Sequence, residues 1–496
     1  MALTIVSLLM FQHSFAQVQQ DWAQALYFPN NGYDEPGAIL TDPSGNVFVT
    51  GSGRPGPSAD LIVAKYNPSG VLQWMSTYNG SGNSTDGGMC LARDASGNIY
   101  VGGTIYTADS ARSVCTAKYN SAGVLQWLVR WDKYGTESVS GAEYAKDIAI
   151  DGAGNIYVFC LCQAGNSFGT EPAASVVLKY NAAGVLLWSQ AYQYNSSDRV
   201  YAIDMKLDPS GNPVIAIASN TDMVIIKYTP SGIISWLRTF GAFGTYEFPV
   251  DMAIDGTGNV FVAGGTGSNI ILQKYSPTGA LSLSTLYVNP YNKDDRAIGI
   301  ALDGTGNVLI GGKSINGSNN QDFLVLKYSP AFALLWAARY SETSTSYEDV
   351  FAMTTDNSGN TYLSGTTTGN GILTAKFSTS GSLAWNIRYT NSSSYCRPSD
   401  MVTFTKSSPF QLPTTVLYVL GFVNASSYNN DVLTIKYSQP SVNAITLLSK
   451  DPSIPVKPVI PARETYSPLL EPEPVFVRIL KSSSGFRPAY CGSVYC

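Results

Sequence analysis

The side chains in this sequence that are best suited to bind a ligand or to do chemistry are carboxylates at a fixed distance from a repeated turn. The turn is Asp-x-x-Gly-Asn, and in six copies a carboxylate stands eight residues before its Asp. These six are Asp34, Asp86, Glu143, Glu247, Asp295 and Glu348, while Asp198 lies two residues further back in its copy and Asp400 opens the corresponding strand of a degenerate copy. If they circle the mouth of a central channel, several could converge on Ca²⁺, which prefers oxygen ligands, or on a basic segment of a partner. We expect instead that each accepts backbone N–H bonds from its own loop.

Histidine chemistry has almost no support in this chain. The only histidine is His13, inside an apolar N-terminal segment that resembles a secretory signal peptide. Without it, catalysis by histidine, a Ser-His-Asp triad and most zinc sites are excluded. The sequence also has no Gly-rich phosphate loop, His-Glu-x-x-His motif or EF-hand loop. Enzymes that use only carboxylates, Tyr, Lys or Arg remain open.

The cysteine count is odd, so an exported chain would keep at least one unpaired thiol. The seven are Cys90, Cys115, Cys160, Cys162, Cys396, Cys491 and Cys496. Cys160 and Cys162 fall on one face of a predicted strand, which suits either a metal pair or, as we expect, free thiols buried between two sheets. Cys491 and Cys496 suit either a small terminal loop or a link between subunits.

These residues are positioned by a repeat that runs through most of the chain. The Asp-x-x-Gly-Asn turn begins at Asp42, Asp94, Asp151, Asp208, Asp255, Asp303 and Asp356, with spacings of 47 to 57 residues. Asp and Gly suit the first position and the positive-φ position of a tight turn. A second half-motif places Lys before an aromatic residue, then a turn with Gly, then Trp. Its lysines are Lys65, Lys118, Lys179, Lys227, Lys274, Lys327, Lys376 and Lys436, and its Trp positions hold Trp74, Trp127, Trp188, Trp236, Leu283, Trp336 and Trp385.

Each period reads as four short strands joined by two tight hairpins and two longer loops. Several strands are apolar on both faces, as in SVVLKY (175–180), so each sheet must be covered on both sides. Four-stranded sheets stacked around an axis satisfy this requirement, which predicts an all-β, β-propeller fold. The degenerate copy near 416–437 lacks its Trp strand, and a spare one stands at Trp22–Phe28. We therefore expect eight blades closed by the N-terminal strand, with seven blades as the alternative.

The pattern DxSGNxYVTG followed by KYNxSGxLxW resembles the repeat of the SBBP ("seven-bladed β-propeller") family and, more distantly, NHL propellers. The resemblance covers about residues 20 to 438, and it implies a secreted or surface protein. The turn-Gly-x-x-Trp element also resembles the Trp-docking repeat of eight-bladed quinoprotein dehydrogenases. That family has adjacent cysteines, whereas this chain has Cys160-Leu161-Cys162. The repeated Trp, Tyr and Lys are expected to pack blades rather than to bind a ligand.

Composition and the chain ends complete the prediction. We expect a signal peptide at 1–16, a propeller at 17–440 and a Pro-rich tail at 441–496. The tail is either disordered or packed on the surface, as we expect, or an extended arm that adds a strand to a neighbouring subunit. Charged residues make up 13% of the chain and the net charge is −5, so nucleic-acid binding has little support. About ten apolar residues at the start are too few to span a bilayer.

Two functions from different classes follow from this sequence. The first is a non-catalytic, secreted or cell-surface propeller that binds protein or glycan, with no cofactor, and acts as a binding or structural module in an extracellular assembly or filament. The second is an enzyme with its site on the propeller axis, either quinoprotein-like or a carboxylate-based hydrolase or lyase. We favour the first, with its binding surface in the variable loops that follow each Trp strand.

Overall fold

The computed structural model describes residues 17–28, 32, 34–108, 112–133, 142–163, 173–193, 200–219, 222–241, 246–368, 370–391, 394–408, 411–426 and 429–439. The chain divides into two compact units, residues 1–442 and 443–496. The predicted signal peptide, the Pro-rich tail, Asp198, Cys491 and Cys496 lie outside the described residues. In the described ranges we find no helix of the length and apolarity that crossing a membrane would require.

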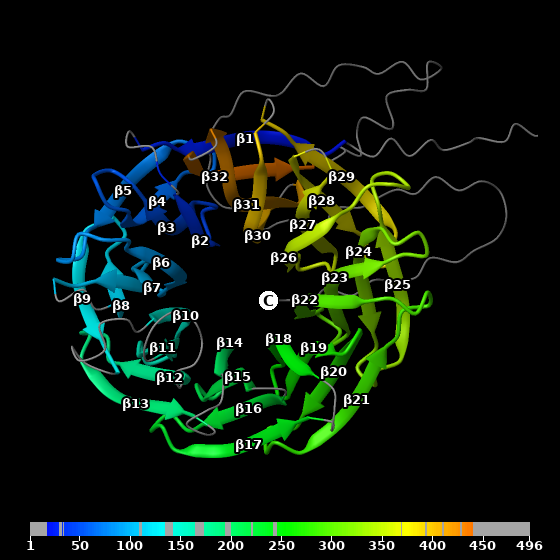
Figure 1. Ribbon diagram of the computed structural model, residues 1–496, viewed down its shortest axis with the longest axis horizontal. Coiled ribbons are helices and arrows are strands. Elements are labelled where there is room, and N and C mark those ends of the chain that lie inside the picture. The colour runs from blue at the N-terminus through cyan, green and yellow to red at the C-terminus, as the bar shows by residue number, and fades with distance from the viewer. Residues whose placement is uncertain are drawn as a thin grey trace, which may run out of the picture. The chain divides into compact units, whose positions relative to one another are not determined.

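The first unit consists of eight four-stranded antiparallel sheets arranged as blades around an axis (Figure 1). Blades 1 to 4 are β2(Glu35–Thr41) β3(Val47–Gly53) β4(Asp60–Tyr66) β5(Leu72–Tyr78); β6(Gly87–Arg93) β7(Ile99–Tyr106) β8(Arg112–Tyr119) β9(Leu125–Trp131); β10(Ala142–Ile150) β11(Ile156–Gln163) β12(Ala173–Tyr180) β13(Leu186–Tyr192); and β14(Val200–Leu207) β15(Pro213–Ser219) β16(Asp222–Tyr228) β17(Ile234–Phe240). Blades 5 to 8 are β18(Glu247–Ile254) β19(Val260–Thr266) β20(Asn269–Tyr275) β21(Leu281–Tyr287); β22(Asp295–Leu302) β23(Val308–Ile315) β24(Gln321–Tyr328) β25(Leu334–Tyr340); β26(Asp349–Thr355) β27(Thr361–Thr367) β28(Gly371–Phe377) β29(Leu383–Tyr389); and β30(Cys396–Ser408) β31(Gln411–Ser426) β32(Asn429–Ser438) with β1(Gln19–Leu26).

Ring closure by the N-terminal strand is confirmed. The last sheet has the order β1-β32-β31-β30, and β1 pairs antiparallel with β32 from Gln19–Ser438 to Leu26–Val432. The strand begins and ends a few residues earlier than the predicted Trp22–Phe28. Blades 8 and 1 also exchange backbone hydrogen bonds, because the Asp34 N–H donates to the Asn430 carbonyl at 3.1 Å. The eight-blade prediction is therefore correct and the seven-blade alternative is wrong.

The order of strands gives the propeller two distinct ends. Each blade starts with its innermost strand and finishes with its outermost, and the chain then crosses to the next blade (Figure 1). We call the end with these crossovers and the loops between second and third strands the crossover face. The opposite end, the hairpin face, has both tight turns. At the first of these turns, the Asp42 carboxylate accepts N–H bonds from Ser44 and Asn46, each at 2.9 Å, and Gly45 has φ +77°. The predicted turn chemistry is confirmed.

The repeated lysines are structural, as predicted. Lys227 lies 2.6 Å from Asp208 of the first hairpin turn in its own blade and donates to the Pro277 carbonyl of the next blade at 3.3 Å. Burial acts to raise the pKa of Asp208, but hydrogen bonds from Lys227 and Asn212 outweigh it and lower that pKa. Other copies place the ammonium over an aromatic ring. The motif positions therefore join the hairpins of neighbouring blades.

The cysteine prediction is also confirmed for the described residues. Cys90, Cys115, Cys160, Cys162 and Cys396 are all free and buried. The sulfurs of Cys160 and Cys162 lie 4.0 Å apart, within the apolar cluster between blades 2 and 3.

Neighbouring blades are held together by the repeated Trp. Its indole N–H donates to a carbonyl in the second hairpin turn of the next blade, and its ring covers the Gly of that turn. The bonds, 3.0 to 3.3 Å long, join Trp22 to Pro68, Trp74 to Ser121, Trp127 to Ala182, Trp188 to Pro230, Trp236 to Pro277 and Trp336 to Thr379. Gly123 has φ +80°, and a Cβ there would lie 2.5 Å from the Trp74 ring. Gly is required at this position for its backbone and for its size.

One junction replaces both partners of this contact. Leu283 of blade 5 stands in the Trp position, and the turn of blade 6 has Phe332 where the other turns have Gly. Phe332 keeps the positive φ, at +63°, and is only 8% exposed. It packs in the same apolar cluster as Leu283. At this junction the large aromatic ring therefore comes from the turn rather than from the strand. Phe332 adopts a positive φ there, which strains its backbone.

This exchange predicts a strong coupling between the two positions. Leu283→Trp alone would place an indole against Phe332, and Phe332→Gly alone would leave a cavity. The double variant rebuilds the common pair, so we expect it to be more stable than the sum of the single changes by about 0.5–3 kcal/mol. Urea unfolding of the four proteins measures this coupling. Purely additive free energies would contradict it, and the reverse exchange at Trp236 and Gly279 is the matched control.

Candidate functional site

The predicted carboxylates lie at the crossover ends of the inner strands, and their side chains are buried. All six are 0–2% exposed. Asp86 accepts the N–H groups of Tyr106, at 2.7 Å, and of Gly80 in the preceding crossover. Glu143 accepts the N–H of Lys133 at 3.0 Å. The expected bonding to nearby backbone N–H groups is therefore confirmed for Asp86 and Glu143, and the arrangement of the six around the mouth of a channel stays a prediction.

Of the other four, two accept backbone N–H bonds and two accept bonds from side chains. Asp34 accepts the Arg54 N–H at 2.9 Å, and Glu348 accepts the Glu342 N–H at 3.2 Å. Glu247 accepts the Thr266 hydroxyl at 3.0 Å, and Asp295 the Asn289 amide at 2.8 Å. Burial raises the pKa of Asp34 and of Glu143 to about 7. No group of three or more metal-ligating side chains comes together in the described part of the chain, so these carboxylates remain separated, one per blade.

A second set of residues, which we call the axial ring, lies on the innermost strands and includes four carboxylates. Every inner strand has a β-bulge near its crossover end, and β30 has a second one further along. The first residue after the crossover-end bulge occupies the same position in all eight blades. In blade order these residues are Ala38, Cys90, Asp147, Asp204, Asp251, Gly299, Ala352 and Asp400. Asp400 thus belongs to this axial ring, and Cys396 occupies the position that the sequence analysis assigned to Asp400.

The axial carboxylates bond to the neighbouring blade. Each accepts the N–H of the residue that follows the equivalent position in the next inner strand. The bonds join Asp147 to Met205 at 3.3 Å, Asp204 to Met252 at 3.0 Å, Asp251 to Ile300 at 2.9 Å and Asp400 to Ile39 at 3.0 Å. Four of the eight junctions are therefore fastened at the axis as well as by the outer contacts.

Three of these carboxylates form a cluster around one cation. Lys206 Nζ lies 2.7 Å from Asp204, 3.8 Å from Asp147 and 4.0 Å from Asp251. Burial acts to raise the pKa of Asp204, but the charge of Lys206 outweighs it and lowers that pKa. Burial raises the pKa of Asp251, and the Asp204 charge raises it further. The cluster can share a proton, but each carboxylate has one oxygen fixed by the next strand.

Sequence reasoning missed this ring although a signal was present. Asp147, Asp204 and Asp251 each stand four residues before the Asp of the hairpin turn, in three consecutive copies. A charged residue within an otherwise apolar strand is uncommon. What the sequence does not reveal is the bulge, which changes the face that the residues before it present.

The exposed aromatic residues gather on the crossover face. Among the described residues six aromatic side chains are strongly exposed, and all lie in crossovers or at the start of an inner strand. They are Tyr27, Tyr201, Tyr246, Tyr291, Tyr347 and Tyr395, with exposures of 41% to 66%. Exposed aliphatic residues such as Val185, Ile233 and Leu335 instead lie at the beginning of the outermost strands. The two ends of the propeller therefore differ in chemistry.

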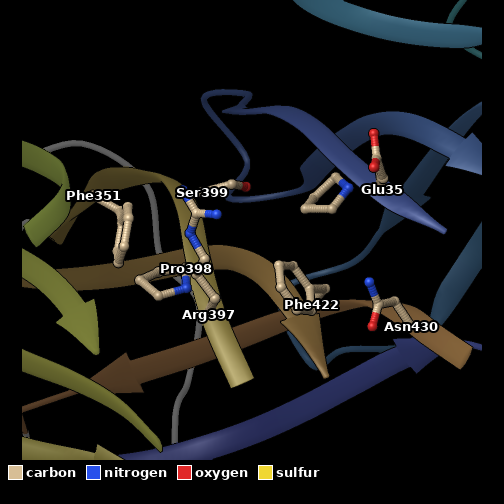
Figure 2. A pocket seen from close by; sticks show the side chains of 8 residues that line it. Glu35, Phe351, Arg397, Pro398, Ser399, Phe422 and Asn430 are labelled. Atoms are coloured by element: carbon tan, nitrogen blue, oxygen red, sulfur yellow. The ribbon is translucent and has the colours of Figure 1, made fainter. Parts of the chain in front are cut away.

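Two pockets open on this face. One, of ≈ 450 Å³, lies where blades 7, 8 and 1 meet and is shown in Figure 2. Arg397 stacks over the ring of Phe351 at 4.0 Å from its centroid, and Glu35 and Asn430 lie on the opposite side. The other, of ≈ 540 Å³, is lined by residues of blades 4, 5 and 6, among them Tyr201, Tyr246, Phe248 and Arg296. Both volumes suit a small ligand or a side chain of a partner.

Comparison with known proteins finds no family for this chain and only distant structural likenesses. No model of a known family matches the sequence, and no curated protein matches it. A protein from Lactobacillus plantarum is 14% identical, with 72% of this chain and 96% of that one covered and a TM-score of 0.44. The WD40 domain of SCAP from fission yeast is 10% identical, with 86% of this chain and 98% of that one covered and a TM-score of 0.46. Puromycin hydrolase is 13% identical, with 82% of this chain and 62% of that one covered and a TM-score of 0.43. About two fifths of that enzyme therefore has no counterpart in this chain.

Likenesses this weak carry no information on activity. The resemblance of the repeat to SBBP and NHL propellers stays a prediction, since no family model matches. The class that the structure defines is an eight-bladed, all-β propeller.

The axial cluster predicts a specific pH dependence of stability. A raised folded-state pKa means that the native protein binds more protons, so its free energy of unfolding falls as the pH rises between the two pKa values. For Asp251 this window runs from 3.8 to about 8. We expect the melting temperature to fall from pH 5 to pH 8, with a shallower fall for Asp251→Asn, whose amide oxygen still accepts the Ile300 N–H.

Asp255→Asn is the matched control for this measurement. Burial acts to raise the pKa of Asp255, but hydrogen bonds from Asn259 and Thr257 outweigh it and lower that pKa. The protonation of Asp255 therefore changes the free energy of unfolding only at pH values around and below its ordinary pKa of 3.8. This variant should lose stability with an unchanged slope above pH 5. Equal slopes for the wild type and Asp251→Asn would contradict the assignment.

Proposed function

We propose that this protein is an exported, non-catalytic propeller that binds a protein or glycan partner on its crossover face. The observation that carries the proposal is the gathering on that one face of all six strongly exposed aromatic residues of the described ranges. Tyr and Arg are enriched where partners bind, because they combine a large contact area with hydrogen-bonding groups. Loops between repeated blades are also where such scaffolds place function.

The axial cluster supports this choice over the carboxylate-based enzyme. A general acid or base must be free to exchange a proton with a substrate. Asp147, Asp204 and Asp251 each accept a backbone N–H of the next blade, and Lys206 lies between them. These groups are explained by joining blades. Histidine, the usual general base, occurs only at position 13.

Export is supported by the sequence rather than by the structure. Residues 2–11 are apolar and Ser14-Phe15-Ala16 provides a small-x-small site before Gln17. The low fraction of charged residues, 13%, and the many Ser, Thr and Asn residues suit an extracellular protein.

The proposal is tested by comparing two triple variants. Tyr246→Ala, Tyr347→Ala and Tyr395→Ala together remove aromatic area from the crossover face. Val185→Ser, Ile233→Ser and Leu335→Ser together are the matched control, since these side chains have similar exposure on the outer strands. Binding to arrays of glycans and of purified extracellular proteins is the measurement.

We expect the crossover variant to lose at least tenfold in affinity for its ligand, which is the loss of about 1.4 kcal/mol expected for a few contact residues. The control should keep the affinity of the wild type. Loss in the control alone would contradict the proposal. Turnover of a substrate that Asp204→Asn abolishes would establish the axial enzyme instead.

A further inference from the structure

The pocket between blades 4, 5 and 6 has a lining that selects one kind of ligand. It is formed by Tyr201, Ala202, Ile203, Ala218, Tyr246, Phe248, Gly267 and Arg296, with a volume of ≈ 540 Å³. The volume is within the range of about 300–1,000 Å³ that small-molecule sites occupy. Three aromatic rings and one charged side chain therefore define its chemistry.

The aromatic rings are held in place by the blade register. Tyr201 and Phe248 occupy the same position of consecutive inner strands, three residues before the axial Asp204 and Asp251. The rings of Tyr246 and Phe248 lie 5.8 Å apart at an interplanar angle of 49°. Phe248 also rests on Gly265, where a Cβ would come within 2.6 Å of its ring. These rings offer flat apolar surfaces with phenol hydroxyls beside them.

Arg296 is the one charged residue of this lining. It takes the same register position in blade 6 that Tyr201 and Phe248 take in blades 4 and 5. Among the described residues no carboxylate lies within ion-pair distance of its guanidinium. A guanidinium has five N–H donors in a planar fork that matches a carboxylate. Arg296 is exposed, so its guanidinium is accessible to a ligand.

The other pocket shows that this chemistry is not general to the face. In blade 8, Arg397 occupies the register position that Arg296 occupies in blade 6. There the guanidinium stacks on Phe351, and Glu35 contributes a negative charge to the same lining (Figure 2). The charges of that pocket cancel, so of the two pockets on the crossover face the one with Arg296 has a net positive charge to complement. A third pocket, on the hairpin face, is lined by Lys406 and Lys436 but lacks the group of three aromatic rings.

We infer that the pocket with Arg296 binds a saccharide ring that carries a carboxylate, as in the uronic acid residues of an acidic glycan. The sugar ring would pack against Tyr246 and Phe248, and its carboxylate would pair with Arg296. This inference rests on the proposed function and gives the chemical class of the partner. A short peptide or a neutral glycan is the competing outcome.

The test uses titration calorimetry with oligosaccharides of galacturonate, glucuronate and mannuronate, each compared with its methyl ester. The esters keep the ring and remove the charge. We expect the acid form of at least one sugar to bind the full-length protein and its ester to bind roughly tenfold to a hundredfold more weakly, as for loss of one charge-assisted pair. Arg296→Gln should lower acid binding to the level of the ester and leave ester binding unchanged. Arg397→Gln, the matched control, should change neither.

Tyr246→Ala should weaken the binding of the acid and of the ester alike. Unchanged melting curves should show that Tyr246→Ala and Arg296→Gln, both at exposed positions, leave the fold intact. Equal binding of acid and ester, or no binding of any of these sugars at millimolar concentration, would overturn the inference. If a protein ligand still depends on Tyr246, Tyr347 and Tyr395 in that case, the proposed function stands and the ligand class is wrong.

Discussion

The contact on which this structure depends is the docking of a Trp indole on the hairpin turn of the next blade. A four-stranded sheet that is apolar on both faces is not stable alone, so each blade needs two neighbours. The indole N–H donates a hydrogen bond to a carbonyl of the turn, and the ring lies over a Gly, as for Trp74 and Gly123. Because the contact repeats around the ring, it fixes the angle between blades. Leu283 and Phe332 show that what must be preserved is the volume shared by the two positions.

Closure of the ring follows from the same contact. Trp22 of β1 docks on the turn at Pro68, so the first strand of the chain completes blade 8 and also holds blade 1. Near the axis the junctions are less uniform. Four have an Asp that bonds to the next inner strand, and the other four have the small residues Ala38, Cys90, Gly299 and Ala352. The inner positions therefore vary between blades, whereas the Trp bond to the next turn recurs at six junctions.

The sequence predicted the fold because its signals are local. An Asp-x-x-Gly-Asn turn needs only its own five residues, and the Trp half-motif recurs in register with it. The carboxylate at Asp86 was correctly expected to bond its own loop for the same reason. Asp204 was missed because its partner, the Met252 N–H, belongs to another blade and a bulge lies between the two repeat positions. The pocket with Tyr201 and Arg296 was missed because it joins three blades through crossovers of different length.

The central claim is that the repeat positions build the ring while the crossover face binds the partner. Hydrogen exchange of the full-length protein with and without a bound ligand tests this claim most directly, because it reports each segment separately. The account predicts that ligand slows exchange around Tyr246–Phe248 and Tyr291–Arg296, and leaves the hairpin turns, such as the one at Gly123, unchanged. Protection centred on the hairpin turns or on the axial strand segment at Asp204, with none at the crossovers, would contradict it.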